Sequence, residues 1–377
     1  MKILVLNVGS SSLKGGVYEM GEGMLADAAA APEWSTQAEW PRADGAAHGR
    51  VAAALRDLPG LTEIRLVGHR VVHGGPGLRA TAWITPEVKA GIAAAAELAP
   101  EHNPVELAAI EEMEGLLGPG ARQAAVFDTA FHATLAPAAY VYPGPYEWLE
   151  RGIRRYGFHG INHQYASRRA VEILGMRGGT ERIVCCHLGN GCSLAAVRGG
   201  VCVDTTMGFT PLEGLMMGSR SGSVDPGILL HLLRRGGATA EALDRTLNEE
   251  SGLKGISGVS NDLRQVLAAV AEGNARARLA FEIYIHRLRA GIGAMAASLA
   301  GMDALVFTGG VGENSDAVRE AACAALGYLG VEMDREKNAA GGGDRDIAAA
   351  GGKARVVVVH AQENWEIARE CRRLARG

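Results

Sequence analysis

The sequence predicts an α/β protein built from two related halves. Apolar strand-like runs alternate with amphipathic helical patterns along the chain, which is typical of sheets covered by helices. The pattern also repeats. A strand, a tight turn and a second strand at residues 3–18 return at 183–197, where Ser193-Leu194 matches Ser12-Leu13. The length of 377 residues suits two domains of roughly 150 residues each better than one.

The predicted strands are short apolar runs that end in small or polar residues. They comprise residues 3–6, 13–18, 183–186, 194–197, 304–307 and 356–359. Two further apolar strands carry Arg70 and lead up to Asp128. Runs this short, bounded by Gly, Ser or Asn, are typical of buried strands.

The predicted helices follow a 3.6-residue apolar period. Pro86 and Glu87 are good first-turn residues for one of them. The helices are predicted at 86–98, 163–174, 226–234, 262–273, 277–300 and 363–375. Residues 20–62 have the weakest pattern, and no element is predicted there.

Composition excludes several classes of protein. The formal charge is −4, so the overall charge does not indicate a nucleic acid or an anionic membrane as a partner. No apolar run reaches the roughly 18 residues of a membrane span, and the first residues lack the long apolar region of a signal peptide. The six cysteines have no zinc-finger spacing and suit buried, reduced thiols. We expect a cytoplasmic protein.

Three turns rich in Gly, Ser or Asn follow predicted strands, at residues 7–12, 188–193 and 308–314. Backbone N–H groups in such turns bind phosphate oxygens, and Gly lets the phosphate approach closely. None has the Walker A pattern or opens a helix with G-x-G-x-x-G. A single turn of this kind is more often an ordinary hairpin turn. Three of them, two mutually similar, favour a phosphate ligand.

Four charged or titratable residues lie in settings that suggest chemistry. Arg70 lies inside an apolar strand and Arg220 in a Gly/Ser loop, where a guanidinium usually faces an anion. Structural ion pairs are the alternative for either arginine. Asp128 ends an apolar strand and could equally be a capping or turn residue. His159, between Phe and Gly, could equally be a packed core histidine.

Taken together, the motifs resemble the acetate kinase family. They occur in the order of that family and extend over nearly the whole chain. The matching segments are Asn7 to Lys14, His69 to Gly75, Phe127 to His132, Arg154 to Gly160, His187 to Gly191, Thr206 to Gly214 and Phe307 to Asn314. The order and number of these motifs make the resemblance far more specific than any one turn.

The resemblance implies a duplicated two-domain actin-like ATPase fold, with ribonuclease H-like halves and the nucleotide in the interdomain cleft. The first domain would comprise residues 1–147 and 361–377. The second would comprise residues 148–360 and carry most of the nucleotide site. The family also implies a homodimer.

The activity implied by the resemblance is reversible phosphoryl transfer from ATP to acetate, giving ADP and acetyl phosphate, with Mg²⁺ or Mn²⁺ as the cofactor. Arg70 would hold the acetate carboxylate, and Asp128 would orient Arg70 or the attacking carboxylate. Arg220 and His159 would donate hydrogen bonds to the transferring phosphoryl group. No general base is required, because acetate is already ionised at neutral pH.

The resemblance also implies the residues of each ligand site. Asn7 and Glu363 would hold the metal, partly through waters. The acetate pocket would be lined by Arg70, Val72, His102, Phe158 and Pro211. The ATP site would comprise Lys14, His187, Leu188, Gly189, Asn190, Gly191, Asp262, Leu263, Arg264, Gly310, Val311, Gly312, Glu313 and Asn314.

One departure from the family concerns the acetate pocket. Glu101, directly before His102, stands where the family has an apolar pocket residue. It would either face the acetate and weaken its binding, or turn outward into solvent as charged groups usually do.

Three alternatives to acetate and ATP remain open. The acceptor could be propionate or another short carboxylate, since one methylene in a pocket is worth only about 1–3 kcal/mol. Pyrophosphate could replace ATP, although the loops on the adenosine side argue against it. A nucleotide-gated binding protein of the actin or chaperone type is a different class, and the two arginines argue against that class.

Overall fold

The computed structural model describes residues 1–9, 11–21, 29–40, 49–176 and 178–377, so Ser10 of the first predicted phosphate turn lies outside the described residues. The chain divides into two compact units. Unit 1 comprises Met1–Ala133, Phe158–Tyr165 and Gln362–Gly377, and unit 2 comprises Thr134–Gly157 and Ala166–Ala361. The division predicted from the sequence, at residues 147 and 360, stays a prediction.

Unit 1 is built on a six-stranded mixed sheet in the order β3-β2-β1-β4-β6-β5. β1 pairs antiparallel with β2 and parallel with β4, and β4 pairs parallel with β6. β3 and β5 complete the two edges in antiparallel pairings. The strands are β1 (Lys2–Val8), β2 (Ser12–Glu19), β3 (Trp34–Glu39), β4 (Leu66–Val71), β5 (Ala82–Trp83) and β6 (Arg122–Phe127).

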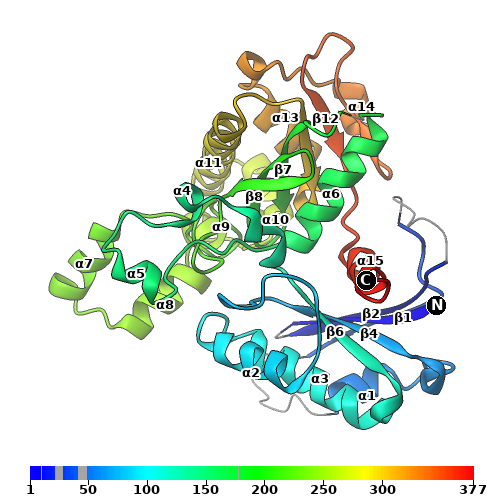
Figure 1. Cartoon of the computed structure of the whole chain (residues 1–377). Helices are drawn as coiled ribbons and strands as arrows, with labels where there is room; N and C mark the ends of the chain where they lie inside the picture. Colours follow the sequence, from blue (N-terminus) through cyan, green and yellow to red (C-terminus); the bar gives the residue numbers. More distant parts are fainter. Residues whose placement is uncertain (10, 22–28, 41–48, 177) are drawn as a thin grey trace. The chain divides into compact units, whose positions relative to one another are not determined.

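Helices cover both faces of this sheet. In Figure 1, α15 lies on one side of the sheet and α1, α2 and α3 lie on the other. These helices span α1 (Arg50–Ala54), α2 (Pro86–Ala94), α3 (Asn103–Leu117) and α15 (Glu363–Leu374). Gly68 of β4 makes the contact with α15 possible, because a Cβ there would lie 2.5 Å from Cys371 Sγ.

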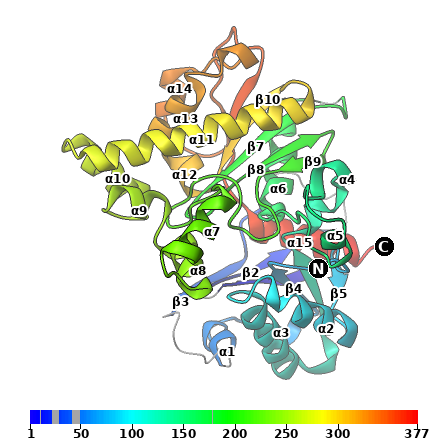
Figure 2. The same cartoon turned by 90° about the vertical axis from the view of Figure 1, so that its left-hand side faces the viewer.

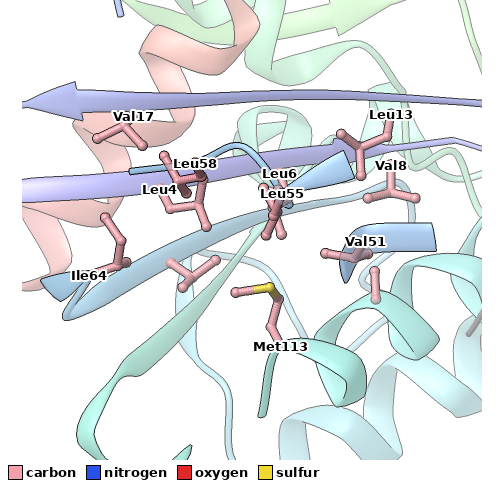
Figure 3. Close-up of a cluster of buried hydrophobic side chains, with 12 residues drawn as sticks. Leu4, Leu6, Val8, Leu13, Val17, Val51, Leu55, Leu58, Ile64 and Met113 are labelled. Atoms are coloured by element: carbon pink, nitrogen blue, oxygen red, sulfur yellow. The ribbon is translucent and has the colours of Figure 1, made fainter. Parts of the chain in front are cut away.

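A buried cluster joins the sheet of unit 1 to α1 and α3 (Figure 3). Leu4 and Leu6 of β1 meet Val51 of α1 and Met113 of α3, and all four are at most 1% exposed. Alternate residues of a strand point to one face, so β1 supplies this cluster at every second position. The cluster fixes α3 under β4, the strand that carries Arg70.

Unit 2 repeats the sheet of unit 1. Its order is β11-β12-β10-β7-β8-β9. β7 pairs antiparallel with β8 and parallel with β10, and β10 pairs parallel with β12. The strands are β7 (Arg182–Leu188), β8 (Cys192–Arg198), β9 (Val201–Thr205), β10 (Ala304–Thr308), β11 (Arg345–Asp346) and β12 (Arg355–Val358). The predicted duplication is confirmed, since β7 and β8 stand in unit 2 where β1 and β2 stand in unit 1.

The longest helix of unit 2 is α11, which packs on β7, β8 and β9 and lies across the sheet in Figure 2. The helices assigned wholly to unit 2 are α4 (Pro137–Tyr140), α5 (Glu147–Glu150), α7 (Pro226–Arg235), α8 (Ala240–Glu249), α9 (Gly252–Ser257), α10 (Leu263–Ala271), α11 (Ala275–Leu299), α12 (Gly309–Asn314), α13 (Asp316–Cys323) and α14 (Arg335–Ala339). α6 (Gly160–Ile173) begins in the part of the chain assigned to unit 1 and ends in the part assigned to unit 2.

Most predicted elements are found within a few residues of their predicted bounds, and the differences have local causes. Residues 308–314 were predicted as a turn, but 309–314 form α12, and a φ of +78° at Gly309 lets the chain turn directly from β10 into this helix. β3 lies in the weakly patterned region. Its side chains alternate between half-buried and exposed and none is fully buried, so this edge strand has no apolar run that would predict it. α3 was not predicted, although Pro104 at its start is a common first-turn residue.

Candidate functional site

The centre of unit 1 is an ion pair at the carboxyl ends of two parallel strands. Arg70 of β4 lies opposite Val126 of β6, two residues before Asp128. Arg70 Nε and Nη2 both donate to Asp128 Oδ2, at 3.1 and 2.5 Å. The side chain of Asp128 is 1% exposed and that of Arg70 15%. A guanidinium held by these two bonds has a fixed orientation, and its Nη1 atom takes no part in them.

Asn7 and Glu363 complete this group of side chains. Asn7 lies near the end of β1, the strand next to β4, and Glu363 is the first residue of α15. Asn7 Nδ2 donates to Glu363 Oε2 at 3.1 Å, and Arg70 Nη1 donates to Asn7 Oδ1 at 3.4 Å. The structure therefore brings together two predicted catalytic residues and both predicted metal ligands.

Burial and the neighbouring charges shift the pKa of Asp128 and of Arg70. Burial raises the pKa of Asp128 to about 6, although Arg70 opposes the shift. Burial disfavours the charge of Arg70, but Asp128, Glu363 and Glu106 outweigh burial and raise its pKa. The raised pKa keeps the Arg70 guanidinium charged at neutral pH, as an anion-binding arginine requires.

The first turn of α3 fixes the end of the Arg70 strand. Asn103 Nδ2 donates to the carbonyl of His73 at 2.9 Å, and Asn103 Oδ1 accepts from the N–H of His73 at 3.2 Å. Glu106 Oε2 accepts from the N–H of Val72 at 2.9 Å. Asn103 and Glu106 are both at most 1% exposed. The backbone next to Arg70 is therefore anchored by two buried side chains of one helix.

The residues predicted to line the acetate pocket are divided between the units. Val72 and Phe158 of unit 1 are buried, and the ring of Phe158 packs at 5.5 Å from that of His73. His102 occupies the N-cap position of α3. Pro211 belongs to unit 2. Glu101 is exposed.

His159 has a left-handed backbone conformation with a φ of +57°. Such a conformation is unusual for a residue with a Cβ, and strained residues of this kind cluster at functional sites. The next residue ties the turn to the ion pair, since the N–H of Gly160 donates to the carbonyl of Asp128 at 3.0 Å. A Cβ at Gly160 would lie 2.1 Å from that carbonyl oxygen, so this approach requires glycine.

Unit 2 contains a cavity of about 780 Å³, within the usual range for small-molecule sites. Eight predicted ATP-site residues line it, together with residues that the sequence did not indicate. The predicted ones are Gly189, Asn190, Asp262, Leu263, Arg264, Gly310, Val311 and Asn314. The others are Leu253, Asn261, Leu267, Tyr284, Ser315, Asp316 and Ala317. The turn after β7 and the start of α12 thus meet at one cavity.

The turn that carries Asn190 is fixed from two sides. The N–H of Gly218 donates to the carbonyl of Asn190 at 3.0 Å, and Asn261 Nδ2 donates to Asn190 Oδ1 at 3.4 Å. A Cβ at Gly218 would lie 2.2 Å from Asn190 Oδ1. Two residues beyond Gly218, Arg220 donates from Nη1 to the carbonyl of Pro211 at 3.3 Å.

Some predicted ATP-site residues do not line the cavity. Leu188 and Gly312 are buried. Glu313 holds His360 Nδ1 and the N–H of Ala361 with its carboxylate. Lys14 of unit 1 is exposed and lies opposite Asn7 in the β1–β2 pair. His187 and Gly191 flank the Asn190 turn without reaching the cavity wall.

Within the described ranges, no group of three or more His, Cys, Asp and Glu side chains could hold a metal ion. In the same part of the chain, no helix is long and apolar enough to cross a membrane. All six cysteines are buried free thiols.

The sequence model of the acetokinase family matches residues 2–369 of this chain. The chain belongs to the acetokinase family. It is 57% identical over 399 residues to the acetate kinase of Gloeobacter violaceus, and the match covers 98% of each chain.

Two solved structures agree with this assignment. The structure is similar to that of the acetate kinase from Porphyromonas gingivalis, with a TM-score of 0.88, 39% identity and 99% of each chain covered. It is also similar to a propionate kinase from Francisella tularensis, with a TM-score of 0.87, 34% identity and 98% of each chain covered. The predicted family and the predicted two-domain actin-like fold are therefore confirmed.

Glu106 is a residue of this acetokinase that sequence reasoning missed, because nothing local marks it as buried. Burial raises its pKa to about 8, from an ordinary value of 4.5. Among the described residues, its Oε1 atom has no hydrogen-bond partner. Between these two pH values the folded chain keeps a proton that the unfolded chain has released.

Glu106→Gln is therefore expected to become increasingly stable relative to the wild type as pH rises from 5 to 8. The wild type loses stability over this range by roughly 1.4 kcal/mol per pH unit, whereas glutamine has no proton to lose and still accepts from Val72. Urea unfolding at four pH values measures the difference, with the exposed Glu111→Gln on the same helix as the control. Parallel stability profiles for Glu106→Gln and the wild type would contradict the burial argument.

Proposed function

We propose that this acetokinase is an acetate kinase that transfers the γ-phosphoryl group of ATP to acetate, giving ADP and acetyl phosphate. The geometry that carries the proposal is the buried Arg70–Asp128 pair beside Asn7 and Glu363. The similarity to acetate kinases over 98% of the chain supports it. In the forward direction a carboxylate oxygen of acetate forms a bond to phosphorus, and the bond from phosphorus to the ADP oxygen breaks.

Arg70 would hold the acetate carboxylate, and Asp128 would keep the guanidinium in place. Arg220 and His159 would donate to the equatorial oxygens of the phosphoryl group, where negative charge spreads in the transition state. The strained backbone of His159 supports this role, because the surrounding structure holds it in an unfavourable conformation. The protein then acts by positioning and by neutralising charge, with no proton to transfer.

The nucleotide would occupy the cavity of unit 2. Asn190 would contact the phosphates from the turn after β7, and Asp262 to Arg264 together with α12 would surround the adenosine. The family resemblance suggests that six further residues would complete the site through backbone groups or charge. These are Lys14, His187, Leu188, Gly191, Gly312 and Glu313. The side chain of Arg264 is 90% exposed, with Asp262 as its partner, and is available to cover a base.

Asn7 and Glu363 fit a magnesium site. Asn7 Nδ2 lies 3.1 Å from Glu363 Oε2, so the Asn7 amide oxygen and the two Glu363 carboxylate oxygens lie near one another, and Mg²⁺ prefers such oxygen ligands. Magnesium binds with few protein ligands and completes its shell with waters and substrate phosphates. Mn²⁺ accepts the same oxygen ligands. When bound, the metal would neutralise charge on the phosphates.

A homodimer is part of the proposal. α7 has no buried residues, and it exposes three large apolar side chains. Ile228 is 50% exposed, Leu230 49% and Leu233 43%. Figure 1 shows α7 at the periphery of unit 2, where a second copy could cover it.

A cytoplasmic location also stays part of the proposal, since the six buried thiols suit a reducing compartment.

Acyl hydroxamate formation tests the proposed function. Purified protein with ATP, Mg²⁺, acetate and hydroxylamine is expected to form acetohydroxamate, because hydroxylamine traps acetyl phosphate. A panel of formate, acetate, propionate and butyrate ranks the acceptors, and replacing ATP with pyrophosphate tests the donor. Higher kcat/KM with propionate would favour the activity named for the Francisella relative. Acetate-independent loss of ATP without hydroxamate would favour a nucleotide-gated binding protein.

A further inference from the structure

Three side chains of unit 2 meet around the loop 206–214, which connects β9 to the segment before α7. Tyr142 Oη donates to Glu213 Oε2, and Arg155 Nη2 donates to Glu213 Oε1 at 2.7 Å. The N–H of Phe209 donates to Tyr142 Oη at 2.9 Å. We call these three side chains, Tyr142, Arg155 and Glu213, the loop clamp.

Arg155 extends the loop clamp along the backbone. Its Nη1 atom donates to the carbonyls of Thr205, Thr206 and Met207, each at 3.0 Å. The side chain of Arg155 is 17% exposed, so these bonds are largely shielded from water. A planar guanidinium satisfied on two edges holds the start of the loop and Glu213 in one fixed relation.

The backbone of Gly208 packs so closely against the loop clamp that no side chain fits at this position. A Cβ at this position would lie 1.7 Å from Glu213 Oε2 and 2.1 Å from Tyr142 Oη. Its carbonyl accepts from the N–H of Tyr156 at 3.0 Å and from that of Gly157 at 3.3 Å. The loop has no helix or strand of its own, so these contacts decide its conformation.

The residue that this loop presents is Pro211. Its carbonyl accepts from Arg220 Nη1 at 3.3 Å, and its ring belongs to the predicted acetate pocket. Any displacement of the loop would therefore move an acceptor that orients Arg220 and a wall of the pocket at once. A guanidinium misplaced by a fraction of an ångström loses much of its effect on a developing charge.

We propose that Tyr142, Arg155 and Glu213 are positioning residues of the phosphoryl transfer, which act on the reaction by holding Pro211 and, through its carbonyl, Arg220. The inference rests on the proposed function and deepens it. If the clamp only stabilised the fold, its loss would not change the ratio of acetate to propionate turnover. Its loss would also lower kcat by the same factor with and without Arg220.

Tyr142→Phe tests the loop clamp, because it removes one oxygen and keeps the ring. We expect kcat with acetate to fall about tenfold, as befits the loss of one or two net hydrogen bonds. The KM for ATP is expected to stay within about twofold, because the cavity of unit 2 does not include the clamp. The ratio of kcat/KM for acetate and propionate is expected to shift by several-fold. Tyr146→Phe is the matched control, since Tyr146 is 73% exposed.

A double-mutant cycle with Arg220→Ala separates positioning from general stability. If Tyr142 acts through Arg220, Tyr142→Phe lowers kcat less than about twofold once Arg220 is absent. The same tenfold loss in both backgrounds, or wild-type kinetics for Tyr142→Phe, would overturn the proposal. If Tyr142→Phe melts below the assay temperature, Glu213→Gln takes its place in the same cycle, since it removes the charge that Arg155 holds. Wild-type protein that forms no hydroxamate would instead contradict the proposed function itself.

Discussion

Arg220→Ala is expected to lower kcat about 10²- to 10³-fold, while the KM for acetate changes much less. The reason is that Arg220 is proposed to donate to charge that develops only in the transition state, so its loss leaves ground-state binding almost intact. Its Nη1 atom already donates to the carbonyl of Pro211 at 3.3 Å, which is one of the contacts that hold the guanidinium in its Gly/Ser loop.

Steady-state kinetics with saturating ATP and Mg²⁺ measures this effect. Arg278→Ala is the control, because Arg278 is an exposed arginine of α11 in the same unit. An Arg220→Ala enzyme that keeps more than half of the wild-type kcat would refute the catalytic role. A large rise in the acetate KM with unchanged kcat would instead make Arg220 a substrate-binding residue.

Arg70→Ala is expected to damage both activity and stability. Activity should fall about 10³-fold or more, the effect of removing an arginine that faces the transferring phosphoryl group. The free energy of unfolding should fall by about 3–5 kcal/mol, because the Asp128 carboxylate is left buried without its partner. The side chain of Asp128 is 1% exposed, so its carboxylate has little contact with solvent and depends on Arg70 for compensation of its charge.

The double variant Arg70→Ala/Asp128→Asn separates the two effects. Removing the unpaired charge should restore most of the lost stability, whereas activity should stay low. Arg56→Ala, an exposed arginine of the same unit, is the control for both measurements. A double variant no more stable than Arg70→Ala would show that the stability loss has another cause. Near wild-type turnover in either variant would exclude Arg70 from the reaction.

The sequence was sufficient to predict features that depend on neighbouring residues. The apolar runs that became β1, β7 and β10 end where small residues interrupt them, so strand positions could be predicted locally. The match of Ser12-Leu13 with Ser193-Leu194 predicted the duplication, which the two sheets confirm strand by strand. Motif order was sufficient to predict the family.

Other features depended on contacts between distant parts of the chain. Glu106 looks like any acidic residue of a helical first turn, yet it is buried because α3 packs against the end of β4. Glu101, five positions earlier, has the same charge and is exposed. No local pattern distinguishes the two carboxylates, since Glu101 lies in the turn before α3, whereas Glu106 lies on the face of α3 that packs against the end of β4.

The loop clamp makes the same point at longer range. Tyr142 and Arg155 reach Glu213 from 71 and 58 positions away along the chain. The sequence shows Gly208, Pro211 and Gly214 in this segment, but not the conformation that the segment adopts. Only the tertiary structure decided this, because an irregular loop makes few hydrogen bonds with itself and takes its shape from the side chains that pack around it.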